Sequence, residues 1–251
     1  MSSVSERRGD WMETEGDDGW LFAPVSGASG ALVAFSGRGS APEGTPSPTE
    51  FLARRLARAS GAGDFPIVRA TQVHGRSVAL VREKPAARAA IDAGEHDVLV
   101  TDRHGVALVV QTADCVPILL RSGRAVAAVH AGWRGSALGV AGAAVEALGE
   151  LGEDPSGIEA WIGPSIGSCC YQVGGEVAAQ FAGDFARRDC TGKFRLDLKA
   201  VNRAQLEAAG IAPAAISIHP SCTKCGGTRY ASYRRDGAAA GRMIALIARV
   251  G

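Results

Sequence analysis

Four short apolar segments follow one another closely between residues 98 and 130, and they restrict the fold more than any other feature of the chain. They cover residues 98–101, 107–111, 116–121 and 125–130. Several are continuously apolar, without the alternation that marks a strand with one face in water. Such strands are buried on both faces, so the chain must place another layer on each side of the sheet.

Further strands and helices are predicted around this block, and they indicate an α/β fold. The other predicted strands cover residues 67–72, 78–82, 158–162 and 215–218, and a hairpin joins 21–25 to 31–35. Predicted helices cover residues 48–60, 136–151, 176–188 and 197–209, the last with Asp197 as N-cap. The chain has 251 residues and no internal repeat. It is expected to form one domain over residues 16–251, preceded by a flexible N-terminal tail over residues 1–15.

Charge and apolar pattern exclude several classes of partner. The net charge is +1 and the pI is about 7.7, so neither nucleic acid nor an anionic membrane surface is expected to bind. The chain has no run of about 18 or more apolar residues, and its N-terminus lacks the apolar core of a signal peptide. We therefore expect a cytoplasmic protein whose six cysteines are reduced thiols.

Three residues of the types that bind zinc lie beside small residues at the ends of apolar segments. They are His74, Cys115 and His130. Two imidazoles and one thiolate form the three-ligand pattern of a catalytic zinc site, in which a fourth position stays open for water or substrate. Taken singly, each has an ordinary explanation, because a cysteine in a strand is commonly a small buried hydrophobe and a histidine at a strand end commonly a hydrogen-bonded surface residue. The spacing matches no zinc-finger pattern and does not decide between these interpretations.

A predicted hairpin over residues 116–130 gives a geometric reason to bring two of these residues together. A two-residue loop at Ser122 and Gly123 would place Cys115 directly opposite His130 in the antiparallel register. Their Cβ atoms would then be about 5 Å apart. This separation would let both side chains bind one metal ion.

Five short motifs follow one another in a fixed order along the chain. They are Gln-Val-His-Gly at 72–75, Ala-Asp-Cys at 113–115, His-Ala-Gly-Trp-Arg-Gly at 130–135, Gly-Pro-Ser-Ile-Gly at 163–167 and Ser-Tyr-Arg-Arg-Asp-Gly at 232–237. Together they resemble the signature segments of the multicopper polyphenol oxidase family, laccase-like bacterial proteins associated with purine nucleoside phosphorylase and adenosine deaminase activity. The resemblance implies a single domain of stacked mixed β-sheets flanked by helices, an α/β fold of α+β-like organisation.

The resemblance also implies a function and a ligand set. Family members bind the catalytic zinc through the positions that correspond to His74, Cys115 and His130, so these are the expected metal ligands and catalytic residues. The implied reactions are phosphorolysis of adenosine, inosine or guanosine, with S-methyl-5'-thioadenosine as a further substrate candidate, and deamination of adenosine. The expected partners are purine nucleosides and inorganic phosphate. The oligomeric state is left undetermined.

Three further residues are candidates for supporting roles. Arg38 is the nearest match to a family arginine that follows a phenylalanine, although the motif around it departs from the family pattern, and it is expected to contact substrate or phosphate. Gln72 and Asp114 neighbour the ligands in sequence, and both are expected to orient them from behind. Asp114 could instead act as an acid or base in the reaction.

Other interpretations of the same residues remain. Cys115 could be the nucleophile and His130 the base of a metal-free thiol hydrolase, or the three ligands could hold a single copper ion in a polyphenol oxidase. A protein that binds without catalysis is disfavoured because all three ligand positions are present. A four-copper centre is excluded, because it needs many more histidines than the five in this chain. The Cys222-x-x-Cys225 pair is interpreted as a loop rather than a second metal site, because no second pair of this kind is present.

Overall fold

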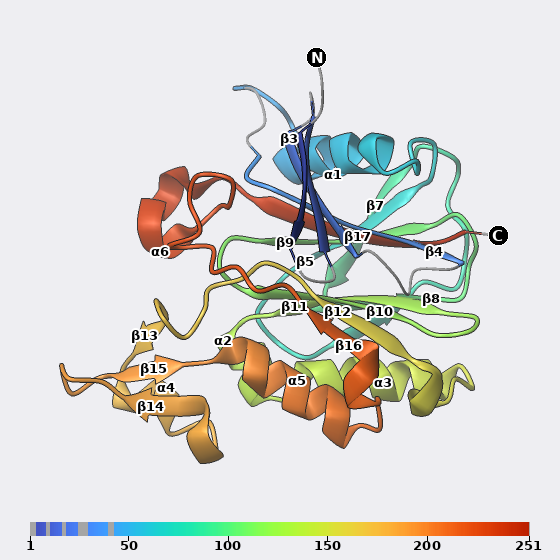
Figure 1. Ribbon diagram of the computed structural model, residues 1–251. Coiled ribbons are helices and arrows are strands. Elements are labelled where there is room, and N and C mark those ends of the chain that lie inside the picture. Colours follow the sequence, from blue (N-terminus) through green and yellow to red (C-terminus); the bar gives the residue numbers. More distant parts are fainter. Residues whose placement is uncertain (1–3, 9–10, 17–18, 25–29, 40–42, 251) are drawn as a thin grey trace.

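Two large β-sheets are stacked face to face at the centre of the molecule, and helices cover their outer faces (Figure 1). The computed structural model describes residues 4–8, 11–16, 19–24, 30–39 and 43–250. A smaller sheet lies beside the stack. The predicted fold class, a single α/β domain of stacked mixed sheets flanked by helices, is confirmed.

Within the described residues, the first sheet has eight strands in the order β1-β2-β3-β4-β17-β9-β5-β7. Their bounds in that order are Val4–Arg8, Trp11–Gly16, Gly19–Pro24, Ala31–Ser36, Met243–Arg249, Ala107–Thr112, Ile67–Thr71 and Ala90–Glu95. Strand β5 runs parallel to β9 and β7, and the other neighbours are antiparallel. The C-terminal strand β17 therefore lies in the middle of the sheet.

The second sheet has six strands in the described part of the chain, in the order β16-β12-β10-β11-β8-β6. Their bounds in that order are Ile216–Ile218, Glu159–Ile162, Val116–Arg121, Val126–Ala131, Val98–Thr101 and Val78–Leu80. The third sheet joins β13 (Gln172–Val173), β15 (Phe194–Leu196) and β14 (Ala186–Arg188). Three of the four closely spaced apolar segments, β10, β11 and β8, thus lie together in the second sheet.

The helices form the two outer layers of the stack. Helix α1 (Pro48–Ala59) covers the first sheet, whereas α3 (Val140–Glu150) and α5 (Leu198–Ala208) cover the second (Figure 1). Shorter helical segments are α2 (Trp133–Ala137), α4 (Gly175–Ala178), α6 (Tyr233–Asp236) and the 3-10 turns Pro155–Gly157, Gly183–Phe185, Pro213–Ala215 and Gly237–Ala240. None of the helices in the described ranges has the length and apolarity needed to span a bilayer.

The apolar strands divide their side chains between two cores, as the sequence predicts. In β10, Leu119 points between the sheets, whereas Ile118 and Leu120 point toward α3 and α5. In β9, Leu108 lies between the sheets and Val109 packs under α1. Burying one such side chain contributes about 1.5–3 kcal/mol, so the layers stabilise one another across both faces of each sheet.

Two predicted helices are corrected by the structure. Over residues 176–188, α4 ends at Ala178, and Gly183 with φ of 69° leads into a 3-10 turn and strand β14. The predicted helix over residues 136–151 begins earlier, at Trp133, and is broken by Gly139, whose φ of 82° is left-handed. Glycine adopts this conformation without steric cost, so the chain turns there.

Two other local predictions have different outcomes. Helix α5 is confirmed with its N-cap, because the Asp197 side chain accepts a hydrogen bond from the Ala200 N–H. Strand β7, Ala90–Glu95, is missing from the predicted elements. Its residues are half-buried or exposed at the edge of the first sheet, so no apolar periodicity marks it.

The predicted flexible tail over residues 1–15 stays a prediction, and the structure describes two strands that begin within it. Strands β1 and β2 form an antiparallel pair that continues the first sheet. Trp11 is 1% exposed, with its ring 5.3 Å from that of Phe35 and 5.0 Å from that of His219. Glu13 is also buried and forms an ion pair with Arg229. All these partners are distant in sequence, so local composition carries no sign of the burial.

Candidate metal centre

The structure brings His74, Cys115 and His130 together, with their ligand atoms within 4.8 Å of one another. His74 lies in the loop after β5, Cys115 immediately precedes β10, and His130 lies near the end of β11. The sulfur of Cys115 is 4.0 Å from Nε2 of His74. The two imidazole rings meet edge to face at 82°, with centroids 4.8 Å apart. Two nitrogen donors and one sulfur donor therefore converge on one point, where they could hold a metal ion.

The register that joins β10 to β11 differs from the prediction by two residues. His130 faces Pro117, not Cys115. The reason is the turn. The Ser122 N–H donates to the Ala125 carbonyl at 2.9 Å, so the two loop residues are Gly123 and Arg124 and not Ser122 and Gly123. Because side chains alternate with a period of two, a two-residue error leaves both ligands on the same face of the sheet. The proximity holds even though the predicted pairing is wrong.

Gly132 leaves the space in which the three side chains meet. A Cβ atom at this position would lie 2.7 Å from Cδ2 of His74 and 3.2 Å from the sulfur of Cys115. The first distance is shorter than real Cβ contacts allow, so any side chain here would push the ligands away. Gly132 is thus a packing requirement of the cluster.

Asp97, which the sequence analysis missed, holds two parts of the cluster. Its Oδ1 lies 2.8 Å from Nδ1 of His130, and its carboxylate accepts the N–H groups of His74 at 3.0 Å and Gly75 at 2.6 Å. The β8–β11 register pairs Val98 with Val129 and so places Asp97 beside His130. Because Nδ1 is engaged by the carboxylate, Nε2 of His130 is left for the cluster. The available signal was an acidic residue directly before an apolar strand.

The cluster is strongly polarised. Burial alone would raise the pKa of Cys115, but its hydrogen bonds and charge interactions with His130 and His74 lower that pKa to about 6. For His130, burial opposes protonation, yet the hydrogen bonds to Asp97 and Cys115 raise its pKa to about 9. Burial likewise opposes the charge of Asp97, and hydrogen bonds with His130 and the backbone lower its pKa. Without a metal ion, these shifts favour the charged series of carboxylate, imidazolium and thiolate over the neutral forms near neutral pH.

A cleft of about 530 Å³ opens over the cluster. Its lining combines the three candidate ligands with aromatic, amide and cationic side chains: Gln72, His74, Gln111, Thr112, Ala113, Asp114, Cys115, His130, Trp133, Tyr171, Tyr233, Arg234 and Arg242. The guanidinium of Arg234 lies 5.0 Å over the ring of Tyr171. The cationic side chains favour an anion such as phosphate, and the aromatic faces favour a planar group. A cleft of this size therefore suits a small molecule with these features.

Gln72 and Asp114 line the cleft, but their side chains fix loops and do not contact the imidazoles in the way expected. The Gln72 amide exchanges two hydrogen bonds of 2.8 Å with the backbone of Gln111 in β9. Asp114, with φ of 91°, accepts hydrogen bonds from Thr223 Oγ1 at 2.6 Å and from the Arg234 N–H at 2.7 Å. The position expected for Asp114, behind a histidine ring, is taken by Asp97.

Arg38 lies near the cleft but is not among its lining residues. Its guanidinium donates to the Ala239 carbonyl at 2.9 Å and lies 3.3 Å from the Asp236 carboxylate. The next residue, Gly39, forms an antiparallel bridge with Arg242, a residue that does line the cleft. Two C-terminal arginines, Arg234 and Arg242, line the cleft, and the expected contact of Arg38 with substrate or phosphate stays a prediction.

The fold and the cluster define an α/β protein with a candidate metal site of two imidazoles and one thiolate in an open cleft. The chain belongs to the multi-copper polyphenol oxidoreductase laccase family, whose model matches residues 45–250. The resemblance inferred from the five motifs is thereby confirmed.

Individual relatives are similar over most of their length. Adenosine deaminase RL5, from an unknown prokaryotic organism, is 39% identical over 199 residues, which cover 73% of this chain and 75% of the relative. Purine nucleoside phosphorylase YlmD of Geobacillus stearothermophilus is 38% identical over 203 residues, 74% of each chain. The crystal structure of YlmD from that organism superposes with a TM-score of 0.80 at 29% identity, covering 100% of both chains.

Proposed function

We propose that this chain is a zinc-dependent purine nucleoside phosphorylase, acting on adenosine, inosine or guanosine, that also deaminates adenosine. The observation that carries the proposal is the convergence of His74, Cys115 and His130 at an open cleft. The names of the relatives support the two activities, since one is called an adenosine deaminase and another a purine nucleoside phosphorylase.

The residues present fit a zinc ion. Imidazole and thiolate are the donors that zinc takes in proteins, and three protein ligands with one open position are typical of a catalytic site. Gly132 keeps the meeting point clear, and Asp97 holds His130 in the orientation that a ligand needs. When bound, zinc would act as a Lewis acid and lower the pKa of a coordinated water.

The other residues of the cleft bind and orient the substrates. Phosphorolysis needs inorganic phosphate beside the ribose carbon that loses the base, and Arg234 and Arg242 supply the charge that holds it. The rings of Tyr171, Tyr233 and Trp133 provide apolar faces for the purine and exclude water from it. For deamination the purine would bind between the same rings, with its amino-bearing carbon toward His74, Cys115 and His130.

Arg38 then has a positioning role. Its contacts with Asp236 and Ala239 brace the segment that carries Arg234 and Arg242. In this proposal Arg38 supports the segment that carries the phosphate-binding arginines and does not contact the phosphate.

The test is a product analysis combined with metal analysis. The purified protein is incubated with adenosine, with and without phosphate, and adenine, ribose 1-phosphate and inosine are quantified by chromatography. Ribose 1-phosphate should form only with phosphate, inosine should form in either case, and zinc should be present at the cluster. Replacing Cys115 by Ser should abolish the zinc at this cluster and both activities, whereas Cys190→Ser, at an isolated exposed cysteine, should change neither.

Free ribose as the sole sugar product would contradict the proposal and indicate a nucleoside hydrolase. Copper at the cluster of the isolated protein, together with oxidation of a phenol, would indicate the polyphenol oxidase alternative.

A metal-free thiol hydrolase is the second candidate, and one observation favours it. Cys115, His130 and Asp97 are connected in series, and the pKa of Cys115 is lowered to about 6, as for a nucleophilic thiol. In this candidate His74 has no role, although its Nε2 lies 4.0 Å from the Cys115 sulfur. It predicts full activity after metal removal and a covalent adduct on Cys115.

A further inference from the structure

Four cysteines outside the candidate metal centre form a second cluster. Cys169, Cys170, Cys222 and Cys225 have sulfur atoms that all lie within 4.8 Å of one another. The sulfurs of Cys169 and Cys225 are 3.7 Å apart, and none of these four cysteines forms a disulfide. None of them belongs to the cleft over His74, Cys115 and His130.

Two loops distant in sequence are joined to make this cluster. Ser165 and Cys222 form a parallel bridge, and the Thr223 N–H donates to the Ser165 carbonyl at 3.0 Å. The first loop then turns, with the Cys170 N–H bonded to the Gly167 carbonyl at 2.9 Å. Both cysteine pairs are thus held by backbone hydrogen bonds that do not depend on the sulfur atoms.

Two glycines allow the close packing of the cysteine loops. A Cβ at Gly167 would lie 3.2 Å from both the sulfur of Cys169 and the Cβ of Cys222. In the second loop the Gly226 N–H donates to the Cys222 carbonyl at 2.7 Å, and a Cβ on Gly226 would lie 2.5 Å from the same oxygen. The Cys-x-x-Cys-Gly turn can therefore close only with glycine at its end.

We propose that Cys169, Cys170, Cys222 and Cys225 bind a second zinc ion through four thiolates. In a tetrahedral site with zinc–sulfur bonds of about 2.3 Å, neighbouring sulfurs are about 3.8 Å apart. The 3.7 Å between Cys169 and Cys225 matches this edge. Four protein ligands leave no open position, so the site is structural rather than catalytic.

The surroundings offset the charge of such a site. Four thiolates around a divalent cation leave two negative charges, which need nearby cations and hydrogen-bond donors at the buried Cys222. The buried ammonium of Lys199 bonds to the Ser221 carbonyl at 2.8 Å, next to Cys222, and attracts that sulfur. Backbone N–H groups, including those of Gly167 and Cys225, are hydrogen-bonded to the Cys222 sulfur and stabilise negative charge on it.

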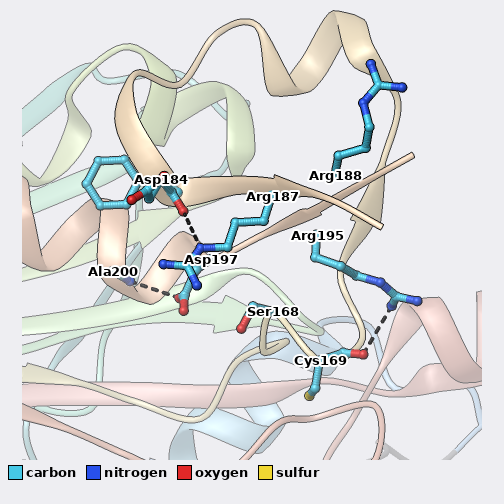
Figure 2. A pocket seen from close by; sticks show the side chains of 9 residues that line it. Ser168, Cys169, Asp184, Arg187, Arg188, Arg195, Asp197 and Ala200 are labelled. Atoms are coloured by element: carbon cyan, nitrogen blue, oxygen red, sulfur yellow. Dashed lines mark hydrogen bonds between the residues drawn. The ribbon is translucent and has the colours of Figure 1, made fainter. Parts of the chain in front are cut away.

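A pocket of about 660 Å³ is lined in part by Cys169, one member of the cluster (Figure 2). There Arg195 donates to the Cys169 carbonyl at 3.1 Å, and the Cys169 sulfur points away from that guanidinium. Cys169 and Cys225 are exposed. Because these two residues are exposed and do not line the cleft over His74, Cys115 and His130, a metal ion could reach the cluster without crossing that cleft.

The second site would connect two walls of the cleft. Tyr171, which follows Cys170, lines the cleft, and Thr223, inside the Cys-x-x-Cys turn, donates to Asp114. Linking both loops through one ion fixes their separation. The sequence analysis interpreted the Cys222–Cys225 pair as a loop because the chain has no second Cys-x-x-Cys. In the structure the other two cysteines of the cluster are the adjacent residues Cys169 and Cys170.

The first experiment measures metal in the isolated, full-length protein by inductively coupled plasma and native mass spectrometry. Two zinc ions per chain are expected. Cys115→Ser should remove one, Cys169→Ser with Cys225→Ser should remove the other, and Cys190→Ser should retain both. This readout is independent of enzymatic activity, so it remains informative if the proposed function fails.

The second experiment keeps all four cysteines and so does not depend on the folding of the double variant. Zinc X-ray absorption on Cys115→Ser should show four sulfur ligands at about 2.3 Å. Cobalt substitution of the same variant should give the intense thiolate charge-transfer absorption of a four-sulfur site. A mass lower by two hydrogens, revealing a disulfide in the cluster, would overturn the proposal, as would iron at this site or no metal in Cys115→Ser.

Discussion

Replacing Gly132 by Ala is the sharpest test of the proposed metal centre, because it adds a single methyl group. The backbone at Gly132 has φ of −75° and ψ of 172°, which alanine adopts without strain. An effect on metal binding must therefore come from what the new Cβ touches. Those atoms belong to His74 and Cys115, two of the three proposed ligands.

The magnitude follows from the distances. The Cβ would lie 2.7 Å from Cδ2 of His74, about 0.7 Å short of the 3.4 Å at which contacts become ordinary. His74 cannot move as a whole, because its N–H is bonded to Asp97 at 3.0 Å, so the ring must rotate away. Disturbing a ligand's orientation costs about 10–100-fold in metal affinity, or about 1.4–2.7 kcal/mol. Displacements on the order of 1 Å cost about a hundredfold in rate.

The assay is competition for zinc against a chromophoric chelator, followed by the adenosine phosphorolysis rate. Gly142→Ala is the matched control, since Gly142 lies in helix α3 with nothing within 4 Å of its new Cβ. It should keep full zinc affinity and gain about 0.5–1 kcal/mol of stability. The loss of the N-cap glycine of α2 costs Gly132→Ala some stability, so its melting curve is recorded alongside. Zinc affinity and rate within about threefold of the parent would refute the three-ligand arrangement.

Three further outcomes are expected. Asp97→Asn should weaken zinc binding by about 10–100-fold in the same competition assay, because the carboxylate charge that orients His130 is lost. An unchanged zinc affinity would show that Asp97 does not support the metal site. Arg234→Ala and Arg242→Ala should each lower kcat/KM for phosphorolysis by about a hundredfold with zinc retained, whereas Arg38→Ala should cost about tenfold or less; the opposite order would return the phosphate contact to Arg38. In protein stripped of metal, the pKa of Cys115 near 6 means that thiolate is present above that pH, so alkylation by iodoacetamide should persist at pH 7 and fall below pH 6; a midpoint near 9 would contradict the polarised cluster.

Sequence alone was sufficient for the parts of the protein that depend on neighbouring residues. The apolar run of β10 gives a strand buried on both faces, and Asp197 begins α5 through its own side chain. The ligand types at His74, Cys115 and His130 were also readable, because donor chemistry is a property of each residue. Even the hairpin error of two residues kept the ligands on one face, since side-chain alternation is a local rule.

Only the tertiary structure decided which distant segments meet. Asp97 reaches His130 because β8 pairs with β11, and Cys169 reaches Cys225 because Ser165 bridges to Cys222. Trp11 is likewise buried by partners far along the chain. Periodicity states which face of a strand is apolar but not which strand lies beside it. That choice is made by the burial and hydrogen bonding of all the layers together, so the partners of the site, unlike its candidate ligands, could not be proposed from the sequence.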